Sequence, residues 1–156
     1  MVSLYRNGLT RYIYRFVHDV REAEELMIDT FAELAADTKY REQASIKTYL
    51  FSIGRNVALR HVKKFKIGAV ANTAIIDDML IDDENTLEAD FIRKEQQGRV
   101  RAAMRALKRE YREVLHLIYF ENMSYADAGK AMRKSVKQIE NLTRRAKASL
   151  KAVIEK

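Results

Sequence analysis

The fold is decided by residues 123–151, MSYADAGKAMRKSVKQIENLTRRAKASLK, close to the C-terminal end of the chain. The pattern predicts a short helix, a tight turn and a long basic helix, which together make a helix-turn-helix. Only residues 132–134 separate the two predicted helices, and Gly129 lies where the helices must come close. A serine followed three residues later by an acid or an amide marks each helix start with capping-box spacing, in the pairs Ser124 with Asp127 and Ser135 with Gln138.

The long helix has two faces of opposite character. We expect its buried stripe to consist of Val136, Ile139, Leu142, Ala146, Leu150 and Val153. The other face carries cationic and amide side chains, which can pair with DNA phosphates and with base edges. The candidate duplex-binding residues are Ser135, Lys137, Gln138, Asn141, Arg144 and Arg145. The pattern favours DNA recognition over the alternative, a basic solvated helix that only packs on its neighbours.

The net charge of +7 is distributed unevenly over the 156 residues. Residues 1–66 carry +4, residues 67–92 carry −7 without a single Lys or Arg, and residues 93–156 carry +10. Two basic blocks around a purely acidic segment predict two domains and a linker between them. Basic domains in turn indicate a polyanionic partner.

The composition excludes several kinds of site. The chain has no Pro, no Cys and only five Gly, which suits long helices and rules out disulfides and thiolate metal sites. It has no Gly-rich phosphate loop and no recognisable nucleophile grouping, so we expect no catalytic residues, no metal site and no cofactor. No window resembles a membrane span or a signal peptide, and the chain is therefore predicted to be cytoplasmic.

Hydrophobic periodicity predicts three helices in the N-terminal block, at residues 2–17, 20–36 and 46–66. Leu4 is the first apolar position of the first helix, while Asp19 and Ser45 are the expected caps of the other two. The second helix carries a stripe of four acids opposite its apolar face, Glu22, Glu25, Asp29 and Glu33. Four acids at this spacing repel one another, so the stripe is either a solvated face or a surface that a cationic partner covers.

Aromatic side chains lie among Lys and Arg around the start of the third helix, at Tyr40, Tyr49 and Phe51. Rings stack on unpaired bases and cations hold phosphates, so this mixture suits single-stranded nucleic acid. The alternative is that the aromatics are core residues; Phe51 is expected on the outer surface of the helix with Leu59 and Val62. Further helices are predicted at 87–106 and 109–121, which makes the fold all-α.

Two blocks of the chain resemble the bacterial extracytoplasmic-function sigma factors of the sigma-70 family. Domain two of that family is similar to residues 4–34, LYRNGLTRYIYRFVHDVREAEELMIDTFAEL, and 44–64, ASIKTYLFSIGRNVALRHVKK. Domain four is similar to residues 106–150, ALKREYREVLHLIYFENMSYADAGKAMRKSVKQIENLTRRAKASL. The chain departs from the family pattern in having Tyr49 for Trp, Lys108 for Pro, Arg133 for Gly, and Leu142 and Thr143 where Arg and Leu are common.

The resemblance implies two small helical domains, an N-terminal bundle at 1–66 and a C-terminal helix-turn-helix domain at 93–156, joined by the acidic linker 67–92. It implies a promoter-specificity subunit of core RNA polymerase, with an anti-sigma protein as a further partner. The polymerase-binding residues would be the four acids of the second helix. The residues that hold the melted promoter strand would be Tyr40, Ser45, Tyr49, Arg55 and Asn56.

Two other functions fit parts of the pattern. A stand-alone helix-turn-helix regulator would bind duplex DNA without polymerase and would typically dimerise, but residues 1–66 offer no obvious dimer seam. A helical adaptor without DNA binding is disfavoured by the +10 charge of residues 93–156.

Overall fold

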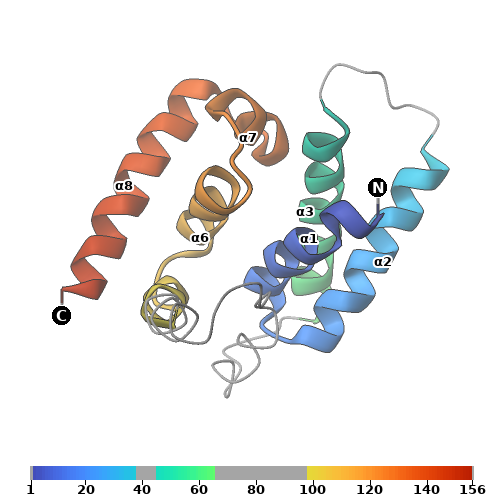
Figure 1. Cartoon of the computed structure of the whole chain (residues 1–156), viewed down its shortest axis with the longest axis horizontal. Coiled ribbons are helices and arrows are strands. Elements are labelled where there is room, and N and C mark those ends of the chain that lie inside the picture. The colour runs from blue at the N-terminus through green and yellow to red at the C-terminus, as the bar shows by residue number, and fades with distance from the viewer. Residues whose placement is uncertain (1, 38–44, 66–97, 156) are drawn as a thin grey trace, which may run out of the picture.

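The computed structural model describes residues 2–37, 45–65 and 98–155, and every regular element in these ranges is helical (Figure 1). The elements are α1 (Val2–Val17), α2 (Val20–Ala36), α3 (Ile46–Phe65), a helical stretch at 98–105, α6 (Arg109–Leu115), the π-helix η1 (His116–Phe120), α7 (Tyr125–Met132) and α8 (Val136–Ile154). The all-α prediction is confirmed. Tyr40, the predicted linker at 67–92 and the first part of the predicted helix 87–106 lie outside the described residues. None of the described helices is both long and apolar enough to span a bilayer.

Side-chain caps fix where several helices begin, as the sequence predicts. Asp19 accepts a hydrogen bond from the Glu22 backbone at 3.0 Å, and Ser45 accepts one from the Thr48 backbone at 3.1 Å. Ser124 caps α7 by accepting from the backbone N–H of Asp127. The complete capping box forms at the start of α8, where Ser135 and Gln138 bond to each other's backbone. Each cap satisfies a backbone donor that has no partner within its own helix.

The turn between α7 and α8 begins one residue later than predicted, because Met132 still belongs to α7. Arg133 then adopts a left-handed conformation with φ of 58°, which is uncommon for a residue other than Gly. The backbone N–H groups of Arg133 and Lys134 both donate to the carbonyl of Gly129. The two helices meet at Gly129, where an added Cβ would lie 2.5 Å from the Lys134 carbonyl oxygen.

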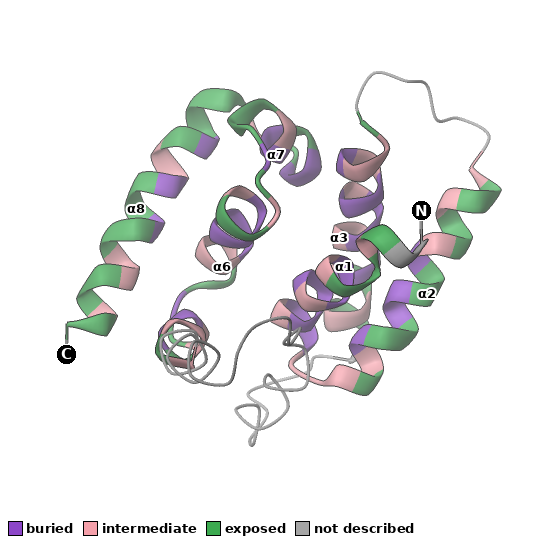
Figure 2. Ribbon diagram, in the orientation of Figure 1, coloured by how far each residue is buried: buried purple, intermediate pink, exposed green. Residues whose placement is uncertain are grey.

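The helices pack into one continuous hydrophobic core. In Figure 1, α1, α2 and α3 form the N-terminal bundle, and α6, α7 and α8 lie beside it. Contacts between α1 and α6 and between α3 and α7 join the two groups. Buried positions concentrate on α1, α3, α6 and α7, whereas the outward sides of α2 and α8 are exposed (Figure 2).

The sequence predicts the wrong degree of burial for three side chains. Phe51 is fully buried rather than on the outer surface, because α3 is packed on several sides, by α1, α2 and α7. Val136 is 50% exposed and Leu4 is 72% exposed, because each lies in the first turn of its helix, before the buried row begins. In α8 that row also contains Thr143, whose hydroxyl donates to the Ile139 carbonyl at 2.7 Å and so needs no outside partner.

Gly129→Ala tests the close approach of α7 and α8. The new methyl group would meet a backbone carbonyl, which has no rotamer by which to move aside, so we expect the free energy of unfolding to fall by about 1–3 kcal/mol. The matched control is Gly98→Ala, where no atom lies within 4 Å of the added Cβ. That variant should be as stable as the wild type or more stable by up to about 1 kcal/mol, since Ala favours helix. Urea unfolding followed by circular dichroism measures both; equal stability of the two variants would contradict the prediction.

Candidate nucleic-acid interface

The candidate duplex-binding residues lie together along the N-terminal half of α8. Ser135, Lys137, Gln138, Arg144 and Arg145 are exposed, and Asn141 is half-buried. The capping box at Ser135 and Gln138 holds the first turn, and one terminal nitrogen of Arg144 donates to Asn141 Oδ1 at 3.1 Å. The structure therefore brings all six residues to one accessible, positively charged surface of a well-capped helix.

A shallow groove runs along one edge of this surface. It has a volume of about 220 Å³ and is lined by Glu110, Lys134, Gln138, Asn141, Leu142 and Arg145. Lys134 lies 3.7 Å from Glu110, so an ion pair within the C-terminal helices forms one wall. Amide and guanidinium groups that converge on an open groove are well placed to pair with base edges.

The candidate strand-binding residues on α3 are more enclosed. Ser45 is occupied as a helix cap, and its hydroxyl also lies 2.9 Å from the Thr48 hydroxyl. The Tyr49 hydroxyl donates to the Asp37 carboxylate at the end of α2, and Asn56 is half-buried. Of this set, only Ser45 is exposed among the described residues.

The Arg55 side chain is only 12% exposed. Its Nε donates to Glu113 Oε1 at 2.6 Å, which is a short ion pair between α3 and α6. Charge-assisted pairs of this length are strong, and the guanidinium is held away from solvent. In this arrangement Arg55 binds a carboxylate of the C-terminal helices.

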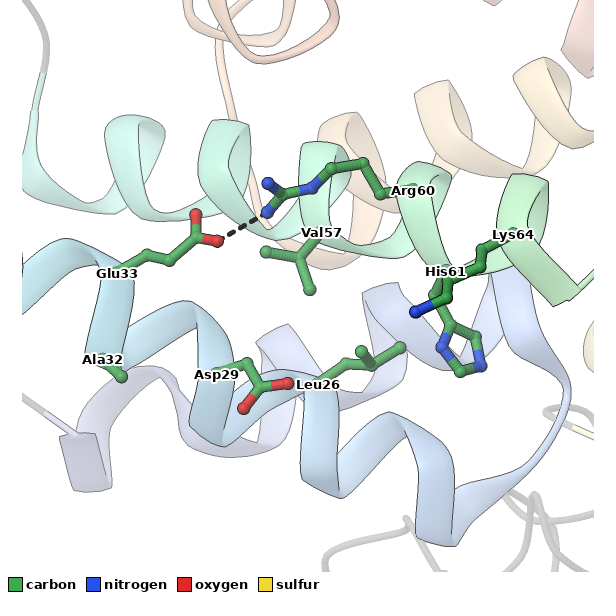
Figure 3. A pocket seen from close by; sticks show the side chains of 8 residues that line it. All are labelled: Leu26, Asp29, Ala32, Glu33, Val57, Arg60, His61 and Lys64. Carbon is green, nitrogen blue, oxygen red and sulfur yellow. Dashed lines mark hydrogen bonds and ion pairs between the residues drawn. The ribbon is translucent and has the colours of Figure 1, made fainter.

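The acidic stripe of α2 lies beside an open groove between α2 and α3, with a volume of about 440 Å³ (Figure 3). Leu26 and Val57 contribute the apolar part of the groove, and Glu33 pairs with Arg60 across it at 2.5 Å. Two of the four acids therefore face bases of their own bundle, because Glu22 also lies 3.3 Å from His61. Glu25 and Asp29 are exposed, and the exposed Ile28 lies between them on the same helix.

A buried polar network of two sets of hydrogen bonds joins the two groups of helices; Glu113 is the centre of the first set, and the Tyr12 and His116 rings, 5.4 Å apart, lie where the sets meet. Glu113 is fully buried; its Oε1 accepts from Arg55 and from the Tyr12 hydroxyl at 3.4 Å. Its Oε2 has no hydrogen-bond partner within the described part of the chain, although Arg109 Nε lies 3.9 Å away. Burial raises the pKa of Glu113 above its usual value, while the charge of Arg55 opposes that shift.

His116 is the centre of the second set of this network. The Arg15 guanidinium donates to its Nδ1 at 2.9 Å, so the ring proton is on Nε2, which lies 3.0 Å from the Glu121 carboxylate. The π-turn creates this pair, because its five-residue hydrogen bond from Glu121 to the His116 carbonyl brings the carboxylate back to the ring. Burial lowers the pKa of His116 to about 4, since a protonated ring would be desolvated and would face Arg15.

Glu121 also reaches the N-terminal bundle. Lys47 donates to its carbonyl at 2.6 Å and forms an ion pair with its carboxylate at 3.3 Å. The carboxylate fits against α1 at Gly8, where an added Cβ would lie 2.5 Å from Glu121 Oε2. Hydrogen bonding from His116 and the charge of Lys47 outweigh burial and lower the pKa of Glu121 below its ordinary value.

Sequence reasoning did not find this network. Its members are Tyr12, Arg15, Lys47, Arg55, Glu113, His116 and Glu121, of which only Arg55 was singled out beforehand as a candidate site residue. The sequence did contain one indication that Glu113 is buried. This acid directly precedes the apolar residues Val114 and Leu115 in a helix that must be buried. An acid at the edge of a buried stripe requires a basic partner, but the identity of that partner depends on tertiary contacts.

Comparison with known sequences matches each half of the chain to a conserved region of the sigma-70 factors. Sigma-70 region 2 matches residues 1–66, and Sigma-70, region 4 matches residues 97–150. The chain is 24% identical over 151 residues to the ECF RNA polymerase sigma factor SigM of Bacillus subtilis, which covers 97% of this chain and 91% of that protein. It is 24% identical over 163 residues to the RNA polymerase sigma-H factor of Pseudomonas aeruginosa, covering 99% and 84% of the two chains.

Solved structures share the fold. The sigma factor RpoE in a co-crystal with the anti-sigma factor NepR from Bartonella quintana matches with a TM-score of 0.71 at 19% identity, over 99% of this chain and 94% of that one. CnrH in complex with the cytosolic domain of CnrY matches with a TM-score of 0.70 at 23% identity, over 99% and 84%. At these identities the likeness concerns the arrangement of helices.

The buried His116 makes stability depend on pH. The unfolded chain binds a proton near pH 6.5, whereas folded His116 binds one only near pH 4, so acid favours unfolding within this window. Between pH 7 and pH 5 we expect this histidine alone to lower the free energy of unfolding by about 2 kcal/mol. His116→Gln can keep the bonds to Arg15 and Glu121 but does not titrate. Urea unfolding at both pH values should show a loss smaller by that amount in the variant; equal losses would contradict the assignment.

Proposed function

The chain belongs to the extracytoplasmic-function group of the sigma-70 family, and from this premise we propose how its parts divide the work of initiating transcription. It is a transcription initiation factor that directs RNA polymerase to promoters. The observation that carries this function is the presence of region 2 and region 4 in one chain, in the order bundle then helix-turn-helix. The proposed boundaries are 1–66 for the first domain, 67–92 for the linker and 93–156 for the second domain.

The proposed upstream-reading surface is the N-terminal half of α8. Its exposed Lys137, Gln138, Arg144 and Arg145 form a cationic and amide-bearing surface, and Ser135 anchors the helix start. Arg and Lys suit phosphates and guanine, while Asn and Gln suit adenine, so the surface has the chemistry for reading duplex DNA. No backbone rearrangement of α8 is needed for it to reach a groove, because this side is already open.

The proposed surface for the melted strand is the first half of α3 and its cap, with Ser45, Tyr49, Arg55 and Asn56, together with Tyr40, which precedes them in the sequence. A flipped base needs a stacking or hydrogen-bonding site, and its phosphates need cations. Arg55 becomes available for this role only when its bond to Glu113 is broken. The function is binding in both domains, with no catalytic step assigned to any residue.

The proposed polymerase-binding surface is the acidic stripe of α2. Glu25, Ile28 and Asp29 are all exposed, which gives an apolar side chain beside two negative charges. Such a surface fits a basic, partly apolar surface of the polymerase. We also propose an anti-sigma protein as a partner, because the two solved sigma factors of similar fold are complexes with NepR and with CnrY.

A stand-alone helix-turn-helix regulator is not favoured, because residues 1–66 match region 2 of sigma factors rather than a dimerisation domain. Run-off transcription from genomic fragments with core polymerase, with and without this protein, tests the function directly. Specific transcripts should appear only in its presence. If the protein binds duplex DNA but does not change transcription by core polymerase, the stand-alone regulator would be favoured instead.

Charge reversal tests the polymerase surface. In the double variant Glu25→Lys/Asp29→Lys, like charges would face the basic partner, and we expect affinity for core polymerase to fall by at least about tenfold. The control is Glu140→Lys/Glu155→Lys, which makes the same charge change at exposed positions of the C-terminal helices. Fluorescence titration of labelled protein with core polymerase, beside circular dichroism spectra, gives both results. Wild-type affinity in the first variant would remove the assignment.

Three further variants separate the two DNA-binding roles. Arg145→Ala should weaken upstream duplex recognition by the holoenzyme by about 1–3 kcal/mol if the guanidinium contacts a base edge. Arg145→Lys keeps the charge and loses the planar fork, so it should restore binding only if the contact is to phosphate. Asn56→Ala should leave duplex binding unchanged and slow promoter opening.

Duplex binding is read by footprinting, and opening by permanganate reaction with melted thymines. The assignment of roles is wrong if Asn56→Ala opens promoters at the wild-type rate while Arg145→Ala retains full duplex affinity.

A further inference from the structure

The shallow groove beside α8 includes one acidic residue, Glu110, from a neighbouring helix. Glu110 lies in the first turn of α6, which packs against α8 (Figure 1). It lines the groove together with Lys134 and Leu142 and with three of the candidate duplex-binding residues, Gln138, Asn141 and Arg145. A residue outside the helix-turn-helix is therefore part of the surface proposed to read duplex DNA.

An acid at this position opposes binding to the DNA backbone. A carboxylate repels phosphates, whereas the C-terminal block as a whole, with a charge of +10 over residues 93–156, attracts them. Packing does not account for the residue either, because the Glu110 side chain is 46% exposed. A favourable partner for Glu110 on DNA must therefore be a hydrogen-bond donor.

Lys134 holds Glu110 at the groove without using all of its capacity to accept hydrogen bonds. The Lys134 Nζ lies 3.7 Å from Glu110 Oε2, a distance at which opposite charges attract but which is too long for a hydrogen bond. The lysine is itself fixed in the turn, because its backbone N–H donates to the Gly129 carbonyl at 2.8 Å. A carboxylate accepts several hydrogen bonds, so Glu110 keeps lone pairs for a ligand in the groove.

Duplex DNA offers few donors to such a carboxylate. In the major groove the purine N7 atoms, guanine O6 and thymine O4 are acceptors, as are the phosphate oxygens, and only the exocyclic amino groups of cytosine and adenine donate. A carboxylate cannot donate, so its partner on DNA is restricted to these two bases. The amides of Gln138 and Asn141 and the apolar Leu142 line the same groove, so a base edge that reaches Glu110 also meets groups that can bond to it or contact a thymine methyl.

We propose that Glu110 is a specificity determinant of upstream DNA recognition, whose carboxylate accepts a hydrogen bond from the amino group of one cytosine or adenine. This inference rests on the proposed function, because it takes the N-terminal half of α8 as the duplex-reading surface. It adds a base contact from α6 and explains the acid in a basic surface. Glu110 rejects guanine, thymine and phosphate at its position, because it offers an acceptor to groups that are acceptors themselves.

The first test measures base preference position by position. A library of duplexes with a randomised upstream region is bound to the holoenzyme, and separately to the full chain alone, and the bound fraction is sequenced. At one position of one strand the wild type should prefer cytosine or adenine over guanine and thymine by at least about fivefold. Glu110→Gln should lower this preference to about twofold or less and leave the other positions unchanged, because a glutamine amide both donates and accepts.

Two control variants isolate the contact. Glu155→Gln makes the same charge change at the exposed end of α8, outside the groove, and should keep all wild-type preferences. Lys134→Ala separates a direct base contact from an effect that passes through the lysine. It should weaken binding uniformly and lower the salt dependence, because a cation is lost, while the preference at the Glu110 position remains. The proposal is overturned if Glu110→Gln retains the wild-type preference or if Lys134→Ala loses it as well.

A chemical change in the DNA tests the hydrogen bond itself. Purine in place of the preferred adenine, or 2-pyrimidinone in place of the preferred cytosine, removes only the exocyclic amino group. We expect this change to weaken binding by the wild type at least about threefold more than binding by Glu110→Ala, because the alanine variant has no bond to lose. Equal losses for the two proteins would contradict a contact between Glu110 and the amino group.

The two hypotheses fail separately. If specific run-off transcripts appear but no base preference depends on Glu110, the initiation function stands and the base contact does not. If no transcripts appear while the full chain shows the preference that depends on Glu110, this residue reads DNA and the proposed function is wrong. The absence of any base preference, in the holoenzyme and in the full chain alone, overturns this inference together with the duplex-reading role of α8.

Discussion

One buried ion pair, between Arg55 and Glu113, constrains how the two groups of helices meet. Neither partner is stable alone in its position: Glu113 is fully buried and Arg55 is only 12% exposed. Removing one partner of such a pair typically costs roughly 3–5 kcal/mol, because the other charge remains desolvated. The pair therefore requires α3 and α6 to be together, and it fixes how the second group of helices lies against the first.

Other features of the interface follow from this constraint. The Tyr12 hydroxyl donates to Glu113, and the Tyr12 ring lies 5.4 Å from the rings of both Phe51 and His116, so Tyr12 links the ion pair to the neighbouring buried rings. The π-turn at the end of α6 sends Glu121 back toward His116 and Lys47, which adds a second polar contact a short distance along the chain. The outward sides of α2 and α8 take no part and remain open (Figure 2).

The three proposed binding surfaces of this sigma factor differ in how accessible they are. The surfaces proposed for polymerase and for upstream duplex DNA are accessible while the domains are together, whereas the surface proposed for the melted strand is enclosed. Within the surface proposed for the melted strand, Arg55 is bound to Glu113 in this arrangement.

Several elements of the fold and site were predictable because they depend on nearby residues. The caps at Asp19, Ser124 and Ser135 act over three residues, and the close approach at Gly129 lies within a single turn motif. Phe51 was misplaced because helical periodicity assumes one buried face, whereas α3 is packed on several sides. The π-turn was also missed, since its extra residue alters the spacing on which periodicity depends.

The sequence by itself determined the helices, their caps, the charge of each block and the family, because these are properties of local spacing and composition. Only the tertiary structure decided which charges meet. Arg55 and Glu113 are 58 positions apart, and no local pattern connects them. The sequence predicts that Arg55 contacts DNA, whereas in the fold it is bound to an acid. Buried Glu113 needs a cationic partner, and the packing of α3 against the C-terminal helices places Arg55 beside it.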